Sequence, residues 1–337
     1  MKVLLLALLF AAQQPDDAAQ RIAAATRLVD AGRIDEGIAA LTKIAADHPD
    51  NETAKYELAL AYMGKGDAEN CRRIAEPLAE MATENRLRVI SVLGSCYDDL
   101  GQRDKAIAIY RRGLALAPTD SGLNFNLAVT LAREGKLDEA RELLKTDTRA
   151  NPWHSSGHLV LATIFEQQNF RVPAVMSYLH FLALEQSPRS ASAAARLQTL
   201  LDLGVESKGK ETKITIDPDA PKQEGDYAPL TMAVAITAAG ATLPEKQKLS
   251  DFERVRQQVA SVVQIFLDLS ADHDDYTAAV QRPFFEAMQK EKLIDTFAAI
   301  AVTPLKLRGA AAPADLQSYQ RWIAPQQKRP MVQAPAK

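Results

Sequence analysis

The sequence contains little glycine, few aromatic residues and only two cysteines. Of its 337 residues, 15 are Gly and 6% are aromatic, while 47% are hydrophobic. β-Sheets favour β-branched and aromatic residues, whereas a chain rich in Ala suits close packing between helices. The hydrophobic fraction is large enough to bury a core, which excludes a disordered chain. The composition therefore favours an all-α protein of more than one domain.

An excess of basic residues is also missing. Lys and Arg number 40 against 43 for Asp and Glu, which gives a formal net charge of −3. Binding along a phosphate backbone depends on clustered positive charge. We therefore expect no nucleic-acid partner.

Enzyme and cofactor signatures are absent as well. The sequence has no G-x-S-x-G elbow, no H-E-x-x-H, no Walker loop and no dinucleotide fingerprint. His154 and His158 have the four-residue spacing of a zinc-binding pair, but no third ligand is evident nearby. The cluster from His273 to Asp275 stands before a predicted helix, where an Asp is a good N-cap. We expect no cofactor, no metal and no small-molecule substrate.

No hydrophobic run is long enough to span a bilayer comfortably. Residues 3–12 form an unbroken apolar run after Lys2, and polar residues follow it. This is the pattern of a secretory signal peptide, so residues 1–17 are predicted to be a signal and short lead, and the mature protein to be periplasmic or secreted. A buried or frayed apolar helix is the alternative. Residues 230–243 are apolar but shorter than the ~20 residues of a membrane span.

One set of landmarks recurs at a nearly constant interval. The turn residues Gly32, Gly66, Gly101, Gly135 and Asn169 are separated by 34, 35, 34 and 34 residues. Such a period indicates a stack of helical hairpins. Each hairpin aligns small residues on its two helices, which allows the helices to approach closely. These are Ala25, Ala59, Gly94, Ala128 and Ala162 on the first helices, and Gly37, Cys71, Ala106, Ala140 and Ala174 on the second.

The third copy carries a recognisable motif. Leu93 and Gly94, Tyr97, Ala106, Tyr110 and Pro118 are similar to the L-G, Y, A, F and P positions of the tetratricopeptide repeat family. The resemblance covers residues 18 to about 188. It implies a superhelix of about five repeats within residues 18–204, in which a helix at 191–203 caps the last hairpin.

The composition changes after the repeats. Residues 205–229 are charged and contain Pro, which predicts a linker with one extended piece at 213–217. A small helical domain is predicted at 230–324, and a disordered tail at 325–337. The expected helices of that domain are 230–241, 248–269, a kinked or divided helix around Pro283 at 275–302, and 314–323.

The two cysteines fall in neighbouring hairpins. Cys71 lies at the small position of one second helix, and Cys96 on the first helix that should pack against it. A disulfide is geometrically conceivable, and export would provide an oxidising compartment. Two buried free thiols are at least as good an interpretation, because free Cys is among the most buried residue types.

The resemblance also implies a binding surface, because first helices of this family line a concave groove that holds a partner segment. The third repeat contributes the polar middle of this groove, between the apolar groove positions of the neighbouring repeats. Apolar anchors in a groove suit the docking of an amphipathic segment. An alternative is that the C-terminal helices fold back and cover the groove. The predicted groove residues are Tyr56, Leu60, Met63, Arg88, Ser91, Ser95, Asp98, Asp99, Phe125, Val129, Arg133 and Leu159.

The sequence therefore predicts a non-enzymatic scaffold that binds a protein or peptide segment outside the cytoplasm. Two alternatives concern the C-terminal helices. They could form a catalytic domain, for which a polar pocket among Phe252, Phe284 and Trp322 would be evidence. They could also pair with a second copy of the chain.

Overall fold

The computed structural model describes residues 17–81, 85–208, 211–215, 227–241, 243 and 246–327. It consists almost wholly of α-helices, which confirms the predicted all-α class. The chain divides into two compact units, residues 1–118 and 119–337. Residues 1–16 of the predicted signal lie outside the described residues, as do 328–337 of the predicted tail.

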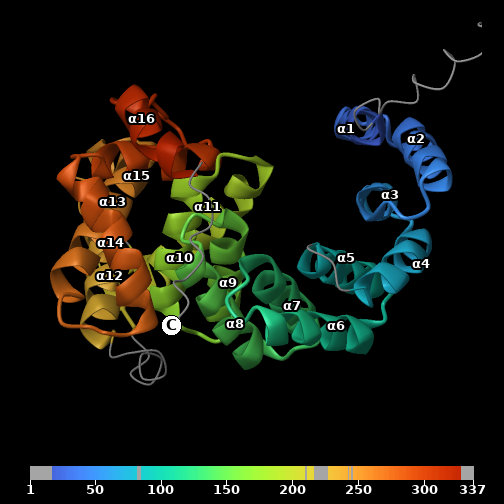
Figure 1. Ribbon diagram of the computed structural model, residues 1–337. Coiled ribbons are helices and arrows are strands. Elements are labelled where there is room, and N and C mark those ends of the chain that lie inside the picture. The colour runs from blue at the N-terminus through green and yellow to red at the C-terminus, as the bar shows by residue number, and fades with distance from the viewer. Residues whose placement is uncertain are drawn as a thin grey trace, which may run out of the picture. The chain divides into compact units, whose positions relative to one another are not determined.

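The first unit is made of three helical hairpins, and each helix packs against the next along the chain (Figure 1). Alternate helices also touch, so the first helices of successive hairpins lie side by side. The six helices are α1 (Asp17–Asp30), α2 (Ile34–Asp47), α3 (Glu52–Lys65), α4 (Ala68–Ala79), α5 (Arg86–Asp99) and α6 (Arg103–Leu116).

The second unit contains two further hairpins, a following helix and the C-terminal helices. The repeat helices are α7 (Ser121–Arg133), α8 (Leu137–Ala150), α9 (Ser155–Gln167), α10 (Arg171–Leu184) and α11 (Pro188–Asp202). The remainder comprises β1 (Val205–Lys208), β2 (Glu211–Ile214), α12 (Ala228–Gly240), η1 (Lys246–Lys248), α13 (Asp251–Leu269), α14 (Tyr276–Lys290), α15 (Ile294–Val302), η2 (Thr303–Leu305) and α16 (Leu316–Gln327).

The turn inside each hairpin depends on a left-handed residue. The four periodic glycines have φ between 72° and 79°, and Asn169 at the fifth turn has φ 60°. Glycine adopts this conformation without strain, and Asn is among the residues that tolerate it best. The interval of 34 or 35 residues in the sequence therefore separates five equivalent helix ends, one in each hairpin.

The predicted small residues do meet inside the hairpins. Ala59, Ala106, Ala128 and Ala162 are at most 1% exposed. Short side chains on both helices bring the backbones together, so larger neighbours can fill the space around the contact.

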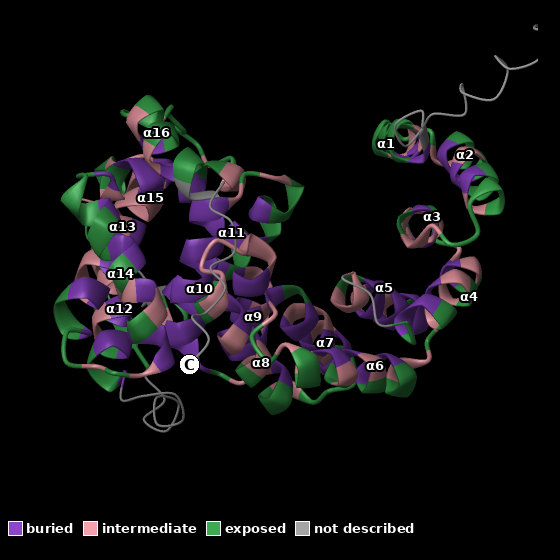
Figure 2. Ribbon diagram, viewed as in Figure 1, coloured by how far each residue is buried: buried purple, intermediate pink, exposed green. Residues whose placement is uncertain are grey.

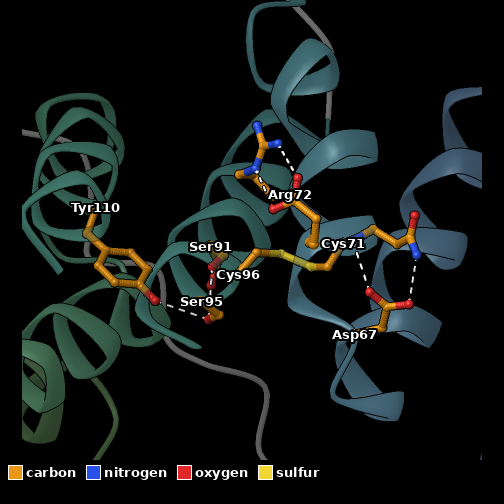
Figure 3. Close-up of a disulfide and its surroundings, with 9 residues drawn as sticks. Asp67, Cys71, Arg72, Ser91, Ser95, Cys96 and Tyr110 are labelled. Atoms are coloured by element: carbon orange, nitrogen blue, oxygen red, sulfur yellow. Dashed lines mark hydrogen bonds and ion pairs between the residues drawn. A yellow bond between two sulfur atoms is a disulfide. The ribbon is translucent and has the colours of Figure 1, made fainter. Parts of the chain in front are cut away.

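The cysteines are joined. A disulfide links Cys71 of α4 to Cys96 of α5, with the Cα atoms 5.9 Å apart and both side chains fully buried (Figure 3). Beside it, the Tyr97 hydroxyl donates a hydrogen bond of 2.5 Å to Glu76 of α4. Of the two interpretations that the sequence left open, the bonded pair is the one present. It fastens the second hairpin to the third.

The C-terminal helices pack against the second helices of the repeats. Helices α12, α14 and α15 contact α10, and α14 also contacts α8. All fourteen residues of α10 are consequently buried (Figure 2). Buried hydrogen bonds join the two layers: Thr148 and Tyr276 share one of 2.6 Å, and the Tyr319 hydroxyl donates to the Ala183 carbonyl at 2.7 Å. These contacts lie within the second compact unit, residues 119–337.

Three details of the C-terminal prediction were wrong. The linker contains a two-stranded antiparallel hairpin that pairs Val205 with Ile214, where we expected one extended piece at 213–217. Residues 275–302 form two separate helices, α14 and α15, which is one of the two predicted forms, but the break lies at Lys292 with φ 58° and Pro283 lies inside α14. The last helix runs through Pro325, where the tail was expected to begin. A proline removes only one helical hydrogen bond, and tertiary packing can outweigh that loss.

Asp275 is the N-cap of α14, as the sequence suggested for this cluster. Its carboxylate accepts hydrogen bonds from the backbone N–H groups of Thr277 and Ala278, and from the Tyr227 hydroxyl at 2.6 Å. Within the described residues, no helix combines the length and hydropathy needed to cross a bilayer.

A candidate partner-binding groove

The predicted groove positions of the first unit centre on α3. Tyr56, Leu60 and Met63 are spaced four and three residues apart, which places them on one helix face, and all three are half-buried. Helix α3 touches α1 on one side and α5 on the other, so this face is continuous with the first helices of the neighbouring hairpins. The partly exposed apolar side chains of α3 are of the kind that a docking segment buries.

Charged groups gather around Tyr56. Partial burial raises the pKa of its hydroxyl, the neighbouring Glu57 raises it further, and Arg88 of α5 lowers it. Burial also raises the pKa of the Glu57 carboxyl, and Asp30 of α1 adds to this effect. These couplings mean that Arg88 and the two carboxylates lie near the same apolar patch.

A pocket lined by two carboxylates and by Arg27 lies at this place, and the repeat pattern did not predict it. A cavity of about 500 Å3 lies between α1 and α3, and both Asp30 and Glu57 line it. Ile22 and Thr26 of α1 contribute to the same wall. Asp30 and Glu57 belong to different repeats and to different positions within them, so the repeat register gave no signal that they meet.

Residues in the polar middle of the predicted groove make contacts within the third hairpin. The Ser95 hydroxyl donates to the Ser91 carbonyl at 3.1 Å and lies 3.0 Å from the Tyr110 hydroxyl of α6 (Figure 3). Asp98 lies 3.7 Å from Arg103 across the turn, and its side chain is 8% exposed. Asp99 and Arg88 are exposed. A role for these residues in binding stays a prediction.

The second unit brings the remaining predicted positions together on α7 and α9. Phe125, Val129 and Leu159 are half-buried, and Arg133 is exposed at the end of α7. The Phe125 ring lies against His154, with a centroid distance of 4.6 Å and a tilt of 59°. The C-terminal helices make their main contacts with α8, α10 and α11 instead. Among the described residues, Phe125, Val129 and Leu159 keep part of their surface exposed.

A cluster of buried polar side chains connects α7, α8 and the start of α9. Asp147 of α8 is fully buried and accepts hydrogen bonds from the Ser121 hydroxyl and from Nδ1 of His154 at 2.7 Å. A side chain at Gly157 would collide with Thr148 at 3.1 Å and with the same carboxylate, so glycine is required there. The serine donates to the aspartate and not to the histidine, which is not the order of a nucleophilic relay.

His154 and His158, which have the spacing of a zinc-binding pair, bind different partners in the structure. His154 bonds to Asp147, whereas Nε2 of His158 lies 2.9 Å from the Pro152 carbonyl. The His158 ring stacks on His180, and both are fully buried. Among the described residues, no group of three or more His, Cys, Asp or Glu side chains is placed to hold a metal.

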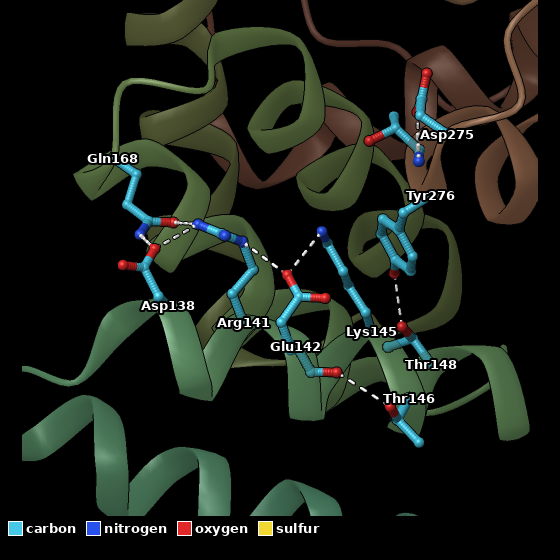
Figure 4. A network of polar contacts seen from close by, with 10 residues as sticks. Asp138, Arg141, Glu142, Lys145, Thr146, Thr148, Gln168, Asp275 and Tyr276 are labelled. Atoms are coloured by element: carbon cyan, nitrogen blue, oxygen red, sulfur yellow. Dashed lines mark hydrogen bonds and ion pairs between the residues drawn. The ribbon is translucent and has the colours of Figure 1, made fainter. Parts of the chain in front are cut away.

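The opposite face of the second unit carries a polar network. Arg141 of α8 binds Asp138 at 2.9 Å and Glu142 at 3.2 Å, and Glu142 also binds Lys145 at 3.0 Å (Figure 4). The Lys145 ammonium lies 5.6 Å from the centre of the Tyr276 ring. These contacts connect α8 to α14 on the face away from the groove positions.

The pocket considered for a catalytic domain is mainly apolar. Phe284 and Trp322 do meet there, with ring centroids 5.6 Å apart, and Arg149 is its charged lining residue. Phe252 is buried on α13 and does not line it. A single arginine among aromatic rings does not provide the paired acid and base of a hydrolytic site.

The sequence pattern of the tetratricopeptide repeat family matches residues 28–95 and 99–164. These residues of the chain are similar to tetratricopeptide repeats. The matched residues run from the end of α1 into α9, and the helical geometry extends the array at both ends, through the rest of α1 and through α10. Arrays of this kind present an extended surface for binding other proteins.

Several solved structures are similar to the repeat region. TTC0263, a tetratricopeptide protein of Thermus thermophilus, is 19% identical with a TM-score of 0.46, covering 55% of this chain and 98% of its own. MamA from Desulfovibrio magneticus is 16% identical with a TM-score of 0.44, covering 52% and 99%. YrrB, described as having an unusual peptide-binding site, is 22% identical with a TM-score of 0.41, covering 54% and 93%. No curated protein matches the sequence.

Proposed function

We propose that this protein is a non-enzymatic scaffold that docks a protein or peptide segment along the first helices of its repeats. One observation carries the proposal. The C-terminal helices cover the second helices of the last repeats, while apolar side chains such as Leu60 and Val129 stay half-exposed on the first helices. Burying such side chains against a partner supplies roughly 25 cal/mol per Å2 of attraction.

The proposed compartment is outside the cytoplasm. The apolar N-terminal run supports export, and the buried Cys71–Cys96 disulfide supports an oxidising environment. A test is to fuse a reporter phosphatase that is active only after export to residue 30. An active fusion is expected, and deletion of residues 3–12 should abolish the activity. An inactive fusion would refute export.

The groove can be tested by site-specific photocrosslinking. A photoreactive residue at Leu60 should capture a defined partner in cells, whereas the same residue at Lys43, exposed on the second helix α2, should not. Replacing Tyr56→Ala together with Phe125→Glu should remove the captured band without changing thermal unfolding, because both side chains are half-exposed. Equal capture from both positions, or capture by the folded double variant, would contradict the groove.

A second candidate function is self-association through α12. Met232 and Ile236 are 47% and 55% exposed and lie four residues apart, so they form an apolar stripe on one face of this helix. Light scattering should then give a dimer for the full chain and a monomer for Ile236→Glu. A monomer in both cases would reject this role.

A further inference from the structure

Both tryptophans of the chain line the same pocket. Trp153 comes from the connection between α8 and α9, and Trp322 from α16, far along the sequence. Phe284 of α14 lies between them, with ring centroids 5.8 Å from Trp153 and 5.6 Å from Trp322. The pocket has a volume of about 420 Å3, which is within the range of small-molecule sites. None of the predicted groove residues lines it.

The floor of the pocket is a stack of buried rings. Phe284 is 7% exposed and stacks on His180 at 3.9 Å, and His180 stacks on His158 at 3.8 Å. Burial lowers the pKa of His180 to about 4, so this stack is uncharged at neutral pH. Pro152 and Pro283 stiffen the backbone on two sides of the pocket. Its walls are therefore formed before any ligand enters.

Arg149 gives the pocket its charge. The guanidinium lies 5.1 Å from the centre of the Tyr276 ring, and the residue is exposed. Arg141, Arg256 and Arg282 of the same unit all bind carboxylates. Within the described part of the chain, Arg149 has no such ion pair. An exposed cation without a carboxylate beside an aromatic pocket attracts an anion.

We propose that this pocket binds a small amphiphilic carboxylate, with its apolar body between the two tryptophans and its carboxylate on Arg149. A sugar or nucleotide would leave its polar groups without partners against these walls, and a cationic amphiphile would meet the arginine. The volume lies near the lower end of the range of ~300–1,000 Å3 that is usual for small-molecule sites, which favours a small ligand. Decanoate, a small carboxylate with an apolar body, is a suitable probe.

The position of the tryptophans makes the pocket easy to observe. Intrinsic tryptophan fluorescence of the full chain arises only at this site, because the sequence has no other Trp. Titration with decanoate, below the concentration at which it forms micelles, should give a saturable spectral shift. Decanol should bind more weakly, and decyltrimethylammonium should produce no saturable shift.

Two variants test where decanoate binds. Calorimetric titration measures the binding as a second readout beside fluorescence. Arg149→Gln should weaken decanoate binding about tenfold and leave decanol binding unchanged, since a hydrogen bond between charged groups is lost. The matched control is Arg308→Gln, whose side chain is 86% exposed and does not line the pocket, and it should bind like wild type. Ala287→Leu, at the exposed rim of the pocket, should block both ligands. The proposal is overturned if no saturable binding occurs, if the cationic amphiphile binds equally well, or if Arg149→Gln binds decanoate like wild type.

Discussion

The backbone of Gly94 in α5 lies directly against the Tyr110 ring of α6. A Cβ on residue 94 would lie 2.6 Å from Cζ of that ring, closer than real contacts allow. The Tyr110 hydroxyl in turn meets Ser95 at 3.0 Å, so the ring is fixed at both its edge and its tip. The central contact of the third hairpin thus requires the absence of a side chain at one position.

Gly94→Ala should therefore destabilise the protein, although Ala is the better helix former by ~1 kcal/mol. We expect a net loss of about 1–3 kcal/mol in the free energy of unfolding, because Tyr110 must move out of a packed site. The measurement is urea denaturation. Gly64→Ala in the last turn of α3 is the matched control, since nothing lies within 4 Å of its would-be Cβ, and it should be neutral or slightly stabilising. A stabilised Gly94→Ala would contradict the packing.

Removing the disulfide should lower stability by about 3.5 kcal/mol, the loop-closure effect for a separation of 25 residues. The double variant Cys71→Ala with Cys96→Ala and the reduced wild type should both show this loss in urea denaturation. Reductant should have no effect on the double variant. If wild type unfolds identically with and without reductant, the bond does not stabilise the fold.

Stability should depend on pH through His180. Its folded pKa of about 4 lies below the ordinary value of 6.5, so the unfolded chain binds more protons between these pH values. The stabilisation is complete above pH 6.5 and is lost as the pH falls toward 4, by about 3 kcal/mol for this one residue. Thermal unfolding from pH 4 to 7 measures the slope.

The matched variant for that experiment replaces His180 and its partner together. Nδ1 of His180 lies 2.6 Å from the Gln281 side-chain oxygen, so His180→Phe with Gln281→Leu removes both polar groups at once. Its melting temperature should fall less between pH 7 and 4 than that of wild type. His158 stays buried in the variant, and the same burial lowers its pKa, so some pH dependence should remain. An unchanged slope would mean that His180 does not titrate as described.

The repeats should not be stable without the C-terminal helices. A chain that ends at Gly204 exposes α10, whose side chains are all buried in the full protein, and leaves Thr148 without Tyr276. We expect a lower melting temperature and increased binding of a hydrophobic dye, because a large apolar surface is uncovered. Unfolding at the same temperature as the full chain would show that the C-terminal helices form an independent domain.

The shared face of α3 could be predicted from the sequence. The repeat register placed Tyr56, Leu60 and Met63 on one face, because residues three and four apart share a side of a helix. The register could not reveal that Ser95 bonds to Tyr110 or that Asp98 pairs with Arg103. Those roles depend on side-chain directions in the neighbouring helix, which spacing does not encode.

The sequence by itself determined the array of hairpins. Its signals are local and repeated: a left-handed residue such as Gly101 at each turn, and a small residue such as Ala106 at each helix contact. Only the tertiary structure decided where the C-terminal helices pack, that the cysteines are bonded, and that Trp153 and Trp322 share a pocket. These contacts join segments that follow no common period. Only the folded structure therefore shows which of these segments are buried against one another.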